Sequence, residues 1–368
     1  MSEYPVTRAL EEAFKKTVKF FFSPFNIVKW LKLSIAGILA GITFNGIGGL
    51  NFNQSIVYSN HTQEAHKNIE DIDKLFNNIK AFLEEPSHLK LVILIAASAF
   101  AVLTSTMLFF SYIGARFYFI FIESLIQDKV EIRKSWHRNK KEAISLFWVN
   151  CLLLFLTLAI ISGIFSLPFW NLYHLYYIGG KSALLYHKNI LIIQFIIAFL
   201  ITIFYLIGLA IFNSLLYDFL VPISYFYKQG IIKSLGNLKE IFLKNLLQFI
   251  LYYLIKIGIA MGCIFVFIIA SLMLILVTLP VLIVGGVVVV GIFAGMLALI
   301  KTHILVSIIV GIIGFIIALV WLLCLVIIYY TPFLPIFSWF KYFSLCFISN
   351  LPGGINFWDT KTRVEIQT

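Results

Sequence analysis

Long apolar runs alternate with short polar segments along almost the whole chain. A helix that crosses a bilayer needs about 20 consecutive apolar residues, and six runs come close to or exceed this length. They are Leu33–Leu50, Leu89–Tyr112, Ala143–Phe165, Ile190–Phe212, Asn245–Leu279 and Ile304–Tyr330. The pattern predicts an all-α fold, a polytopic transmembrane helix bundle of six spans.

A seventh apolar run, Val281–Ile300, is ambiguous. It follows Pro280 directly and contains four glycines. Irregular backbone is tolerated at membrane depth only where protein shields it, so the run is either a short seventh span or a re-entrant hairpin. We expect six spans, with both termini on the same side of the membrane.

Two segments have the spacing of amphipathic helices. In Thr7–Phe22, apolar residues recur at helical intervals and Glu–Lys pairs four residues apart occupy the other face. This helix either lies in the membrane interface or packs on the protein's own cytoplasmic face. A second such pattern, Ile69–Leu83, falls in an external loop. We therefore divide the chain into an N-terminal segment 1–32, a membrane domain 33–357 with the loop 51–88, and a polar tail 358–368.

The distribution of charge indicates orientation and argues against a nucleic-acid partner. The chain is 61% hydrophobic and 12% charged, with a mean hydropathy of +0.97 and a net charge of +11. Lys and Arg cluster between the apolar runs: six up to Lys32, six in Lys129–Lys141 and four in Lys228–Lys244. Alternating spans place these clusters on one side, which the positive-inside rule makes cytoplasmic. We expect a multi-pass protein of the cytoplasmic (inner) membrane with a cytoplasmic N-terminus.

One basic connector has a second copy further along the chain. The segment "IRKSWHRNKKEAISLFW" from Ile132 aligns with "IIKSLGNLKEIFLKNL" from Ile231, at an offset of about 99 residues with a one-residue slip. Each copy joins two apolar runs in the same order, which predicts a parallel internal repeat. The alternative is that Lys-rich connectors resemble one another through composition alone.

Three blocks of the sequence resemble a known family. They are "ALEEAFKKTVKFFFSPFNIVKWLKLSIAGILAG", "GARFYFIFIESLIQDKVEIRKSWHRNKKEAISLFW" and "PFLPIFSWFKYFSLCFISNL". In this order they resemble an uncharacterised bacterial polytopic integral-membrane family of unknown function. The segment "DFLVPISYFYKQGIIKSLGNLKEIFLKN" is distantly similar to the membrane domain attached to some glycerophosphodiester phosphodiesterases. The resemblance implies a helical membrane fold and no activity. The chain departs from the family pattern at Lys341, where Arg is preferred, and at Val281–Ile300, which looks like an insertion.

Charged residues within apolar runs are the candidates for function, because they are costly in a bilayer. Lys256 could meet an acidic partner, bind a lipid phosphate, or extend its ammonium group to the interface. Arg116 and Asp218 lie at matching depth in the two repeat halves, so we predict that they form an ion pair. By contrast, Asp128, Glu131 and Glu142 are expected in solvated connectors.

Glycines at four-residue spacing predict close helix packing. Gly37 and Gly41 form one GxxxG motif, and Gly291 and Gly295 form another. Either motif could pack within one subunit or form the contact of a homo-oligomer.

No pattern of catalytic, cofactor-binding or metal-binding residues is visible. For example, His61 and His66 are five residues apart, which does not match the i,i+4 pair of a zinc-binding helix. We therefore expect no enzyme, cofactor or metal.

The leading hypothesis is a non-enzymatic scaffold or accessory subunit whose partners are membrane lipids and another membrane protein or a second copy. The alternative is a transporter or lipid-handling protein that uses Lys256.

Overall fold

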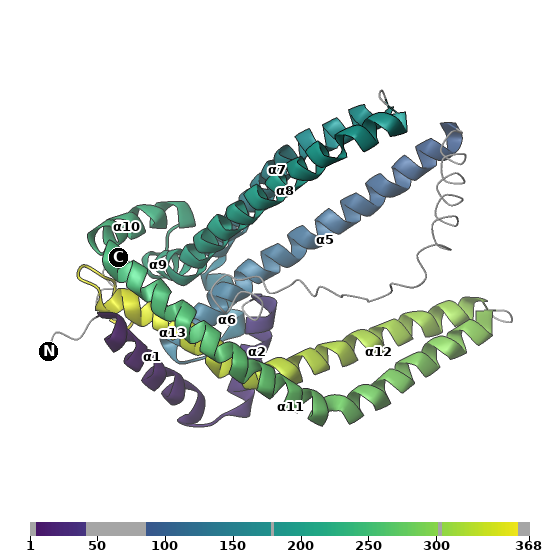
Figure 1. The fold of residues 1–368 in the computed structure, drawn as a ribbon. Coiled ribbons are helices and arrows are strands. Elements are labelled where there is room, and N and C mark those ends of the chain that lie inside the picture. Colours follow the sequence, from purple (N-terminus) through teal and green to yellow (C-terminus); the bar gives the residue numbers. More distant parts are fainter. Residues whose placement is uncertain (1–4, 42–85, 178–179, 301–303, 360–368) are drawn as a thin grey trace.

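The computed structural model describes residues 5–41, 86–177, 180–300 and 304–359, and every named element in these ranges is a helix (Figure 1). The all-α prediction is therefore confirmed. The elements are α1 (Pro5–Phe22), α2 (Ile27–Leu39), α5 (Pro86–Gln127), α6 (Ile132–Arg138), α7 (Lys140–Tyr177), α8 (Gly180–Leu215), the π-helical η1 (Leu216–Leu220), α9 (Val221–Tyr227), α10 (Ile231–Lys244), α11 (Leu246–Ile300), α12 (Ile304–Tyr330), the 3₁₀ turn η2 (Thr331–Phe333) and α13 (Leu334–Asn350).

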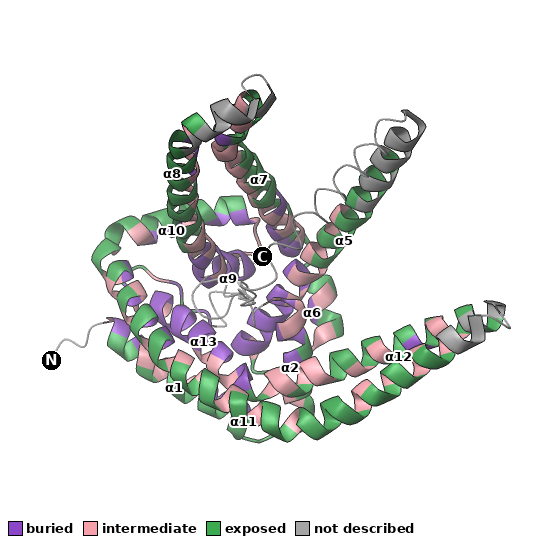
Figure 2. Cartoon of the chain, turned by 45° about the vertical axis from the view of Figure 1, so that its right-hand side comes forward, coloured by how far each residue is buried: buried purple, intermediate pink, exposed green. Residues whose placement is uncertain are grey.

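The helices form a packed core from which three arms extend (Figure 1). We call these the α5 arm, the α7–α8 arm and the α11–α12 arm. The core consists of the shorter helices α1, α2, α6, α9, α10 and α13, together with the inner ends of the arm helices. Buried residues concentrate in the core, whereas the described parts of the arms are largely exposed (Figure 2).

Five helical stretches in the described residues are long and apolar enough to cross a membrane. They are Phe100–Gln127, Lys140–Leu175, Asn189–Tyr227, Leu246–Met296 and Ile308–Asn350. This is the composition of a multi-pass membrane protein. The second half of the predicted first span, Leu33–Leu50, lies outside the described residues, and so does the predicted helix Ile69–Leu83. The first half belongs to α2 as far as Leu39, where this helix ends.

The run Val281–Ile300 is neither a separate span nor a re-entrant hairpin, which corrects the sequence interpretation. It continues α11, which passes through Pro280 without interruption. Proline removes one helical hydrogen bond and bends a helix instead of necessarily ending it, and α11 is bent along its length (Figure 1).

Helices α1 and α13 pack against each other in the core. The Asn350 side-chain amide donates to Glu12 at 3.0 Å, and the Phe20 and Tyr342 rings lie 6.2 Å apart. The side of α1 that faces α13 is buried, including Ala9 and Ala13. One face of α1 thus packs on the protein, which was the second of the two interpretations of its amphipathic pattern.

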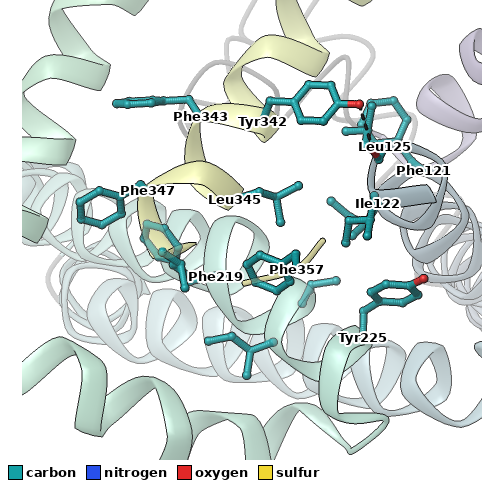
Figure 3. Packing of buried hydrophobic residues seen from close by; sticks show 14 of the residues in the cluster. Phe121, Ile122, Leu125, Phe219, Tyr225, Tyr342, Phe343, Leu345, Phe347 and Phe357 are labelled. Carbon is teal, nitrogen blue, oxygen red and sulfur yellow. Dashed lines mark hydrogen bonds between the residues drawn. The ribbon is translucent and has the colours of Figure 1, made fainter. Parts of the chain in front are cut away.

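Aromatic and aliphatic side chains from distant segments fill the centre of the core (Figure 3). Phe121 and Leu125 come from the inner end of α5, and Leu345 and Phe347 come from α13. The Tyr342 hydroxyl donates to the Leu125 carbonyl at 2.9 Å, which satisfies the polar end of a buried ring. The inner end of α5 is therefore held directly by the C-terminal helix.

The predicted internal repeat appears in the backbone at matching positions. Asp128 and Lys228 have φ angles of 57° and 53° and are the described non-glycine residues with positive φ. A positive φ is uncommon for residues other than glycine, and here each of the two directly follows a helix and precedes a basic connector. Both copies run in the same direction (Figure 1). The connectors differ in length, with 7 residues in α6 and 14 in α10.

Candidate functional site

Three charged side chains meet where the inner ends of the arms converge. Asp218 belongs to η1, Lys256 to α11 and Lys341 to α13. One carboxylate oxygen of Asp218 forms an ion pair with the Lys256 ammonium group, and the other lies 2.8 Å from Lys341 Nζ. The three residues are only 2%, 3% and 4% exposed, respectively. We call this cluster the buried triad.

A local distortion of the helix carries Asp218. In an α-helix the carbonyl of Asp218 would accept from residue 222, but this residue is Pro222, which has no N–H. The chain forms a π-helical turn over Leu216–Leu220, in which the Val221 N–H donates to the Leu216 carbonyl, five residues earlier. Single π turns inside α-helices frequently occur at functional sites. The sequence around Pro222 thus explains why the helix widens at the acidic residue.

Hydroxyl and aromatic groups surround the charges. Ser214 Oγ donates to Asp218 at 3.0 Å and lies 3.4 Å from Lys256 Nζ. The Lys341 ammonium lies 5.5 Å from the centre of the Tyr118 ring, within the range of cation–π attraction. Tyr118 in turn donates to the Tyr217 carbonyl at 2.7 Å. These contacts link the inner ends of α5, α8 and α11 to α13 through one polar cluster.

The triad has one carboxylate for two ammonium groups, so its formal charge is +1. A buried charge is tolerated only when it is paired and hydrogen-bonded, and here Asp218 is the paired anion of both lysines. The arrangement is suited to holding helices in place. Among the described residues, no three of His, Cys, Asp and Glu lie together as ligands of a metal ion would.

Three hollows in the described part of the chain lie away from the triad. One, of about 340 Å³, is lined by residues of α9, α10 and the segment 353–356. A second, of about 170 Å³, lies between α7 and α8 and includes His174 and His187. A third, of about 450 Å³, lies against Pro280, Gly285 and Trp321. No triad residue lines any of the three, so none of them gives access to Lys256.

Lys256 has a partner of a predicted kind, whereas Arg116 and Asp218 do not pair with each other. Lys256 has an acidic partner, Asp218, which was one of its three possible roles. The predicted Arg116–Asp218 ion pair is wrong. Arg116 instead donates from Nη1 to the Trp136 carbonyl at 2.8 Å, and its guanidinium lies 4.5 Å from the centre of the Trp136 ring. Arg116 therefore fixes the connector helix α6 to α5.

Lys341 was missed as a site residue, because the sequence interpretation noted it only as a departure from the family pattern. Its position did carry a signal. It is the only Lys, Arg, Asp or Glu in the otherwise uncharged helix α13. A lone charge inside such a helix requires a buried partner, and the structure shows that this partner is Asp218.

A second buried acidic residue, Glu123, was also missed. Its carboxylate accepts from Asn139 at 2.6 Å and from Gln127 at 2.9 Å, and it forms an ion pair with Arg138 at 2.6 Å. Lys228 of the second repeat half donates to Asn139 at 2.6 Å. Glu123 thus joins the two connectors, and we call these residues the Glu123 network.

The prediction of solvated connector acids is partly wrong. Asp128 and Glu131 are exposed to a large extent, with side chains 54% and 41% exposed, and each pairs with a lysine. Glu142, however, is only 4% exposed. It occupies the first turn of α7, where the helix N-terminus favours a negative charge.

The four predicted packing glycines have different roles. A Cβ on Gly37 would touch Leu334 at 3.5 Å, so Gly37 does lie at a close helix contact. Gly41 instead follows the end of α2 with φ of 68°, a conformation that favours glycine. Gly291 and Gly295 have no described atom within 4 Å of an added Cβ. They make no close contact with another helix in the part of the chain that the structure describes.

Other glycines, which we had not singled out as packing residues, bring α11 and α12 together. A Cβ on Gly285 would overlap the Trp321 indole, and one on Gly314 would overlap Ile292. These contacts cross between the two helices of one arm. The glycine-rich part of α11 therefore does allow close packing, at positions outside its GxxxG motif.

Comparison with protein-family models gave one match that covers most of the chain. Residues 4–354 match a family of unknown function, DUF7544. The chain belongs to this family. The matched residues include the whole buried triad and the Glu123 network, so both lie within the part of the chain that the family has in common. The comparison with curated proteins and the comparison with solved structures each gave no match.

Proposed function

We propose that this protein is a non-enzymatic membrane scaffold or accessory subunit, in which the core holds three apolar arms at fixed positions. One observation carries the proposal. In the most apolar stretches of the four spans from Lys140 onward, at most 11% of the residues are buried inside the protein. These stretches therefore leave most of their residues open to lipid or to spans of other proteins.

The divergence of the arms favours this role over transport. A transport path must be enclosed by spans that pack on one another, whereas the described arms spread apart from the core (Figure 2). The charged residue that could serve a transporter or a lipid-handling protein, Lys256, is 3% exposed and paired with Asp218. This alternative has less support.

The location of the basic connectors supports the proposed orientation. Helices α6 and α10 lie in the core with α1 (Figure 1), and all three carry exposed Lys or Arg residues. By the positive-inside rule the core faces the cytoplasm. We accordingly propose a cytoplasmic-membrane protein with a cytoplasmic N-terminus, with membrane lipids and either another membrane protein or a second copy of this chain as partners.

Co-purification tests the proposal. The tagged protein would be extracted in native-lipid nanodiscs, and its co-purifying proteins identified by mass spectrometry. We expect a stoichiometric partner, which a Gly291→Leu/Gly295→Leu variant loses, because leucines there block close approach of another helix. A Cβ added at either position has no described atom within 4 Å. Gly208→Leu, at an equally open position of α8, should keep the partner.

A partner bound equally by all variants would agree with the accessory role and would show that the open glycine face of α11 is not the contact. One outcome would contradict the proposal itself. Recovery of the chain with one enriched lipid and no protein partner would favour the lipid-handling alternative instead.

A further inference from the structure

The bend between α1 and α2 carries a ridge of exposed apolar side chains. In α1 they follow at four-residue intervals, on a face other than the one that packs on α13. Their exposed fractions range from 39% for Val18 to 63% for Ile27. The ridge consists of Phe14, Val18, Phe22, Phe25, Ile27, Val28 and Leu31. A row of this kind on a packed helix pair marks a surface for interaction.

The ridge belongs to an ordered part of the chain. The Trp30 indole donates to the Phe21 carbonyl at 3.1 Å, and the rings of Phe22 and Phe25 lie 5.8 and 5.6 Å from the Trp30 ring. Asn26 caps α2 by accepting from the backbone N–H of Val28 at 3.0 Å. Phe22 and Phe25 thus pack on Trp30 at the bend and are still 53% and 62% exposed.

Positive charge accompanies the ridge. Residues 5–39 contain six Lys or Arg and two Glu, and both glutamates are already paired, Glu11 with Lys15 and Glu12 with Arg8. Lys19 and Lys32 are exposed and directly follow the ridge residues Val18 and Leu31 in the sequence. Apolar side chains with lysines beside them are typical of helices that lie in the interface of anionic membranes.

The ridge also lies close to the base of an arm. Ser34, three residues after Leu31, forms a hydrogen bond of 2.9 Å with Thr331, just after the end of α12. The α11–α12 arm therefore enters the core next to the ridge. An arm that crosses a bilayer would place the ridge at its base near the headgroups of one leaflet.

We propose that the α1–α2 ridge inserts into the headgroup region of an anionic leaflet, and that Lys19 and Lys32 bind the lipid phosphates. The ridge would bind anionic lipids more tightly than zwitterionic lipids, and it would fix the position of the core relative to the membrane surface. This inference does not depend on the scaffold proposal, which concerns the arms.

Lipid retention tests the selectivity. The full-length protein is placed in nanodiscs of phosphatidylglycerol and phosphatidylcholine in equal amounts, and native mass spectrometry measures the lipids that stay bound. Each lysine near an anionic surface contributes about fivefold to binding. Lys19→Gln/Lys32→Gln should therefore reduce retained phosphatidylglycerol about fivefold or more. Lys233→Gln/Lys239→Gln, at exposed positions of α10, should match wild type. No loss, or equal loss in both variants, would overturn the proposal.

A second measurement identifies what covers the ridge. A photo-crosslinking p-benzoylphenylalanine placed at Phe25, which is 62% exposed, should yield adducts with phosphatidylglycerol. A crosslinked dimer of the chain in place of lipid adducts would show that the ridge contacts a second copy, and would refute the lipid assignment.

Discussion

Asp218→Asn is the substitution that we expect to destabilise the core most. The native triad has a formal charge of +1, and the substitution raises this to +2 while removing both ion pairs. Loss of one partner of a buried pair costs about 3–5 kcal/mol. Lys256 and Lys341 are 3% and 4% exposed, so water does not replace the carboxylate. We expect the free energy of unfolding to fall by at least about 3 kcal/mol.

Replacing Lys341 should lower the free energy of unfolding by less than replacing Asp218. Lys341→Met leaves Asp218 and Lys256 as a neutral pair, and it also removes the repulsion between the two ammonium groups. The lost charged hydrogen bond contributes about 1.5–3 kcal/mol, and the relieved repulsion offsets part of this. The double variant Asp218→Asn/Lys341→Met should be no less stable than Asp218→Asn alone, because it contains one unpaired ammonium group instead of two.

Reversible unfolding in mixed micelles, with increasing sodium dodecyl sulfate, measures these differences. Lys233→Met, at an exposed position of α10, is the control and should stay within about 0.5 kcal/mol of wild type. The reasoning would be refuted if Asp218→Asn were as stable as the control, or if Lys341→Met cost as much as Asp218→Asn. Either result would mean that the shared carboxylate does not hold the two lysines.

Two further substitutions test other parts of the fold by the same unfolding measurement. Glu123→Gln should lower the free energy of unfolding by about 2–4 kcal/mol, because it removes a buried charge that accepts several hydrogen bonds. The control Glu131→Gln, on the connector surface, should lower it by less than about 0.5 kcal/mol. Equal effects of the two substitutions would contradict the assigned role of the Glu123 network. Gly285→Ala should cost about 1–3 kcal/mol, since its methyl group would overlap the Trp321 indole. Gly291→Ala meets open space and should be neutral or slightly stabilising; destabilisation there would show a contact that the single chain lacks.

The sequence was sufficient to predict the helical class and the apolar spans, because the length and hydropathy of a run determine whether it can cross a bilayer. It failed at Val281–Ile300, where Pro280 and the glycines suggested a break. A helix is the arrangement that satisfies backbone hydrogen bonds in lipid within one segment, and one proline does not outweigh that requirement. The spread of the arms could not be predicted, since helices that are apolar on all sides show no face that identifies a neighbour.

The candidate site was only partly predictable, because charged residues in apolar runs can be found from sequence but their partners cannot. Lys256 and Asp218 were both recognised as candidates for this reason. Their pairing depends on the rotation of α11 and on the widened turn before Pro222, which brings Asp218 between two helices. Matching depth in the repeat suggested Arg116 as the partner, but depth does not define the direction in which a side chain points.

The length of α11 has a mechanical consequence. The helix begins at Leu246 in the core, contains Lys256 of the triad, and continues to Ile300 in the arm. At about 1.5 Å per residue, roughly 66 Å of helix separates Lys256 from its outer end. A rotation of about 10° at the triad would carry that end sideways by about 11 Å if the helix moved as one rod. The contacts of Asp218 with Lys256 thus help to set the direction of α11, and a small change in them would displace the outer end of the arm by many ångströms.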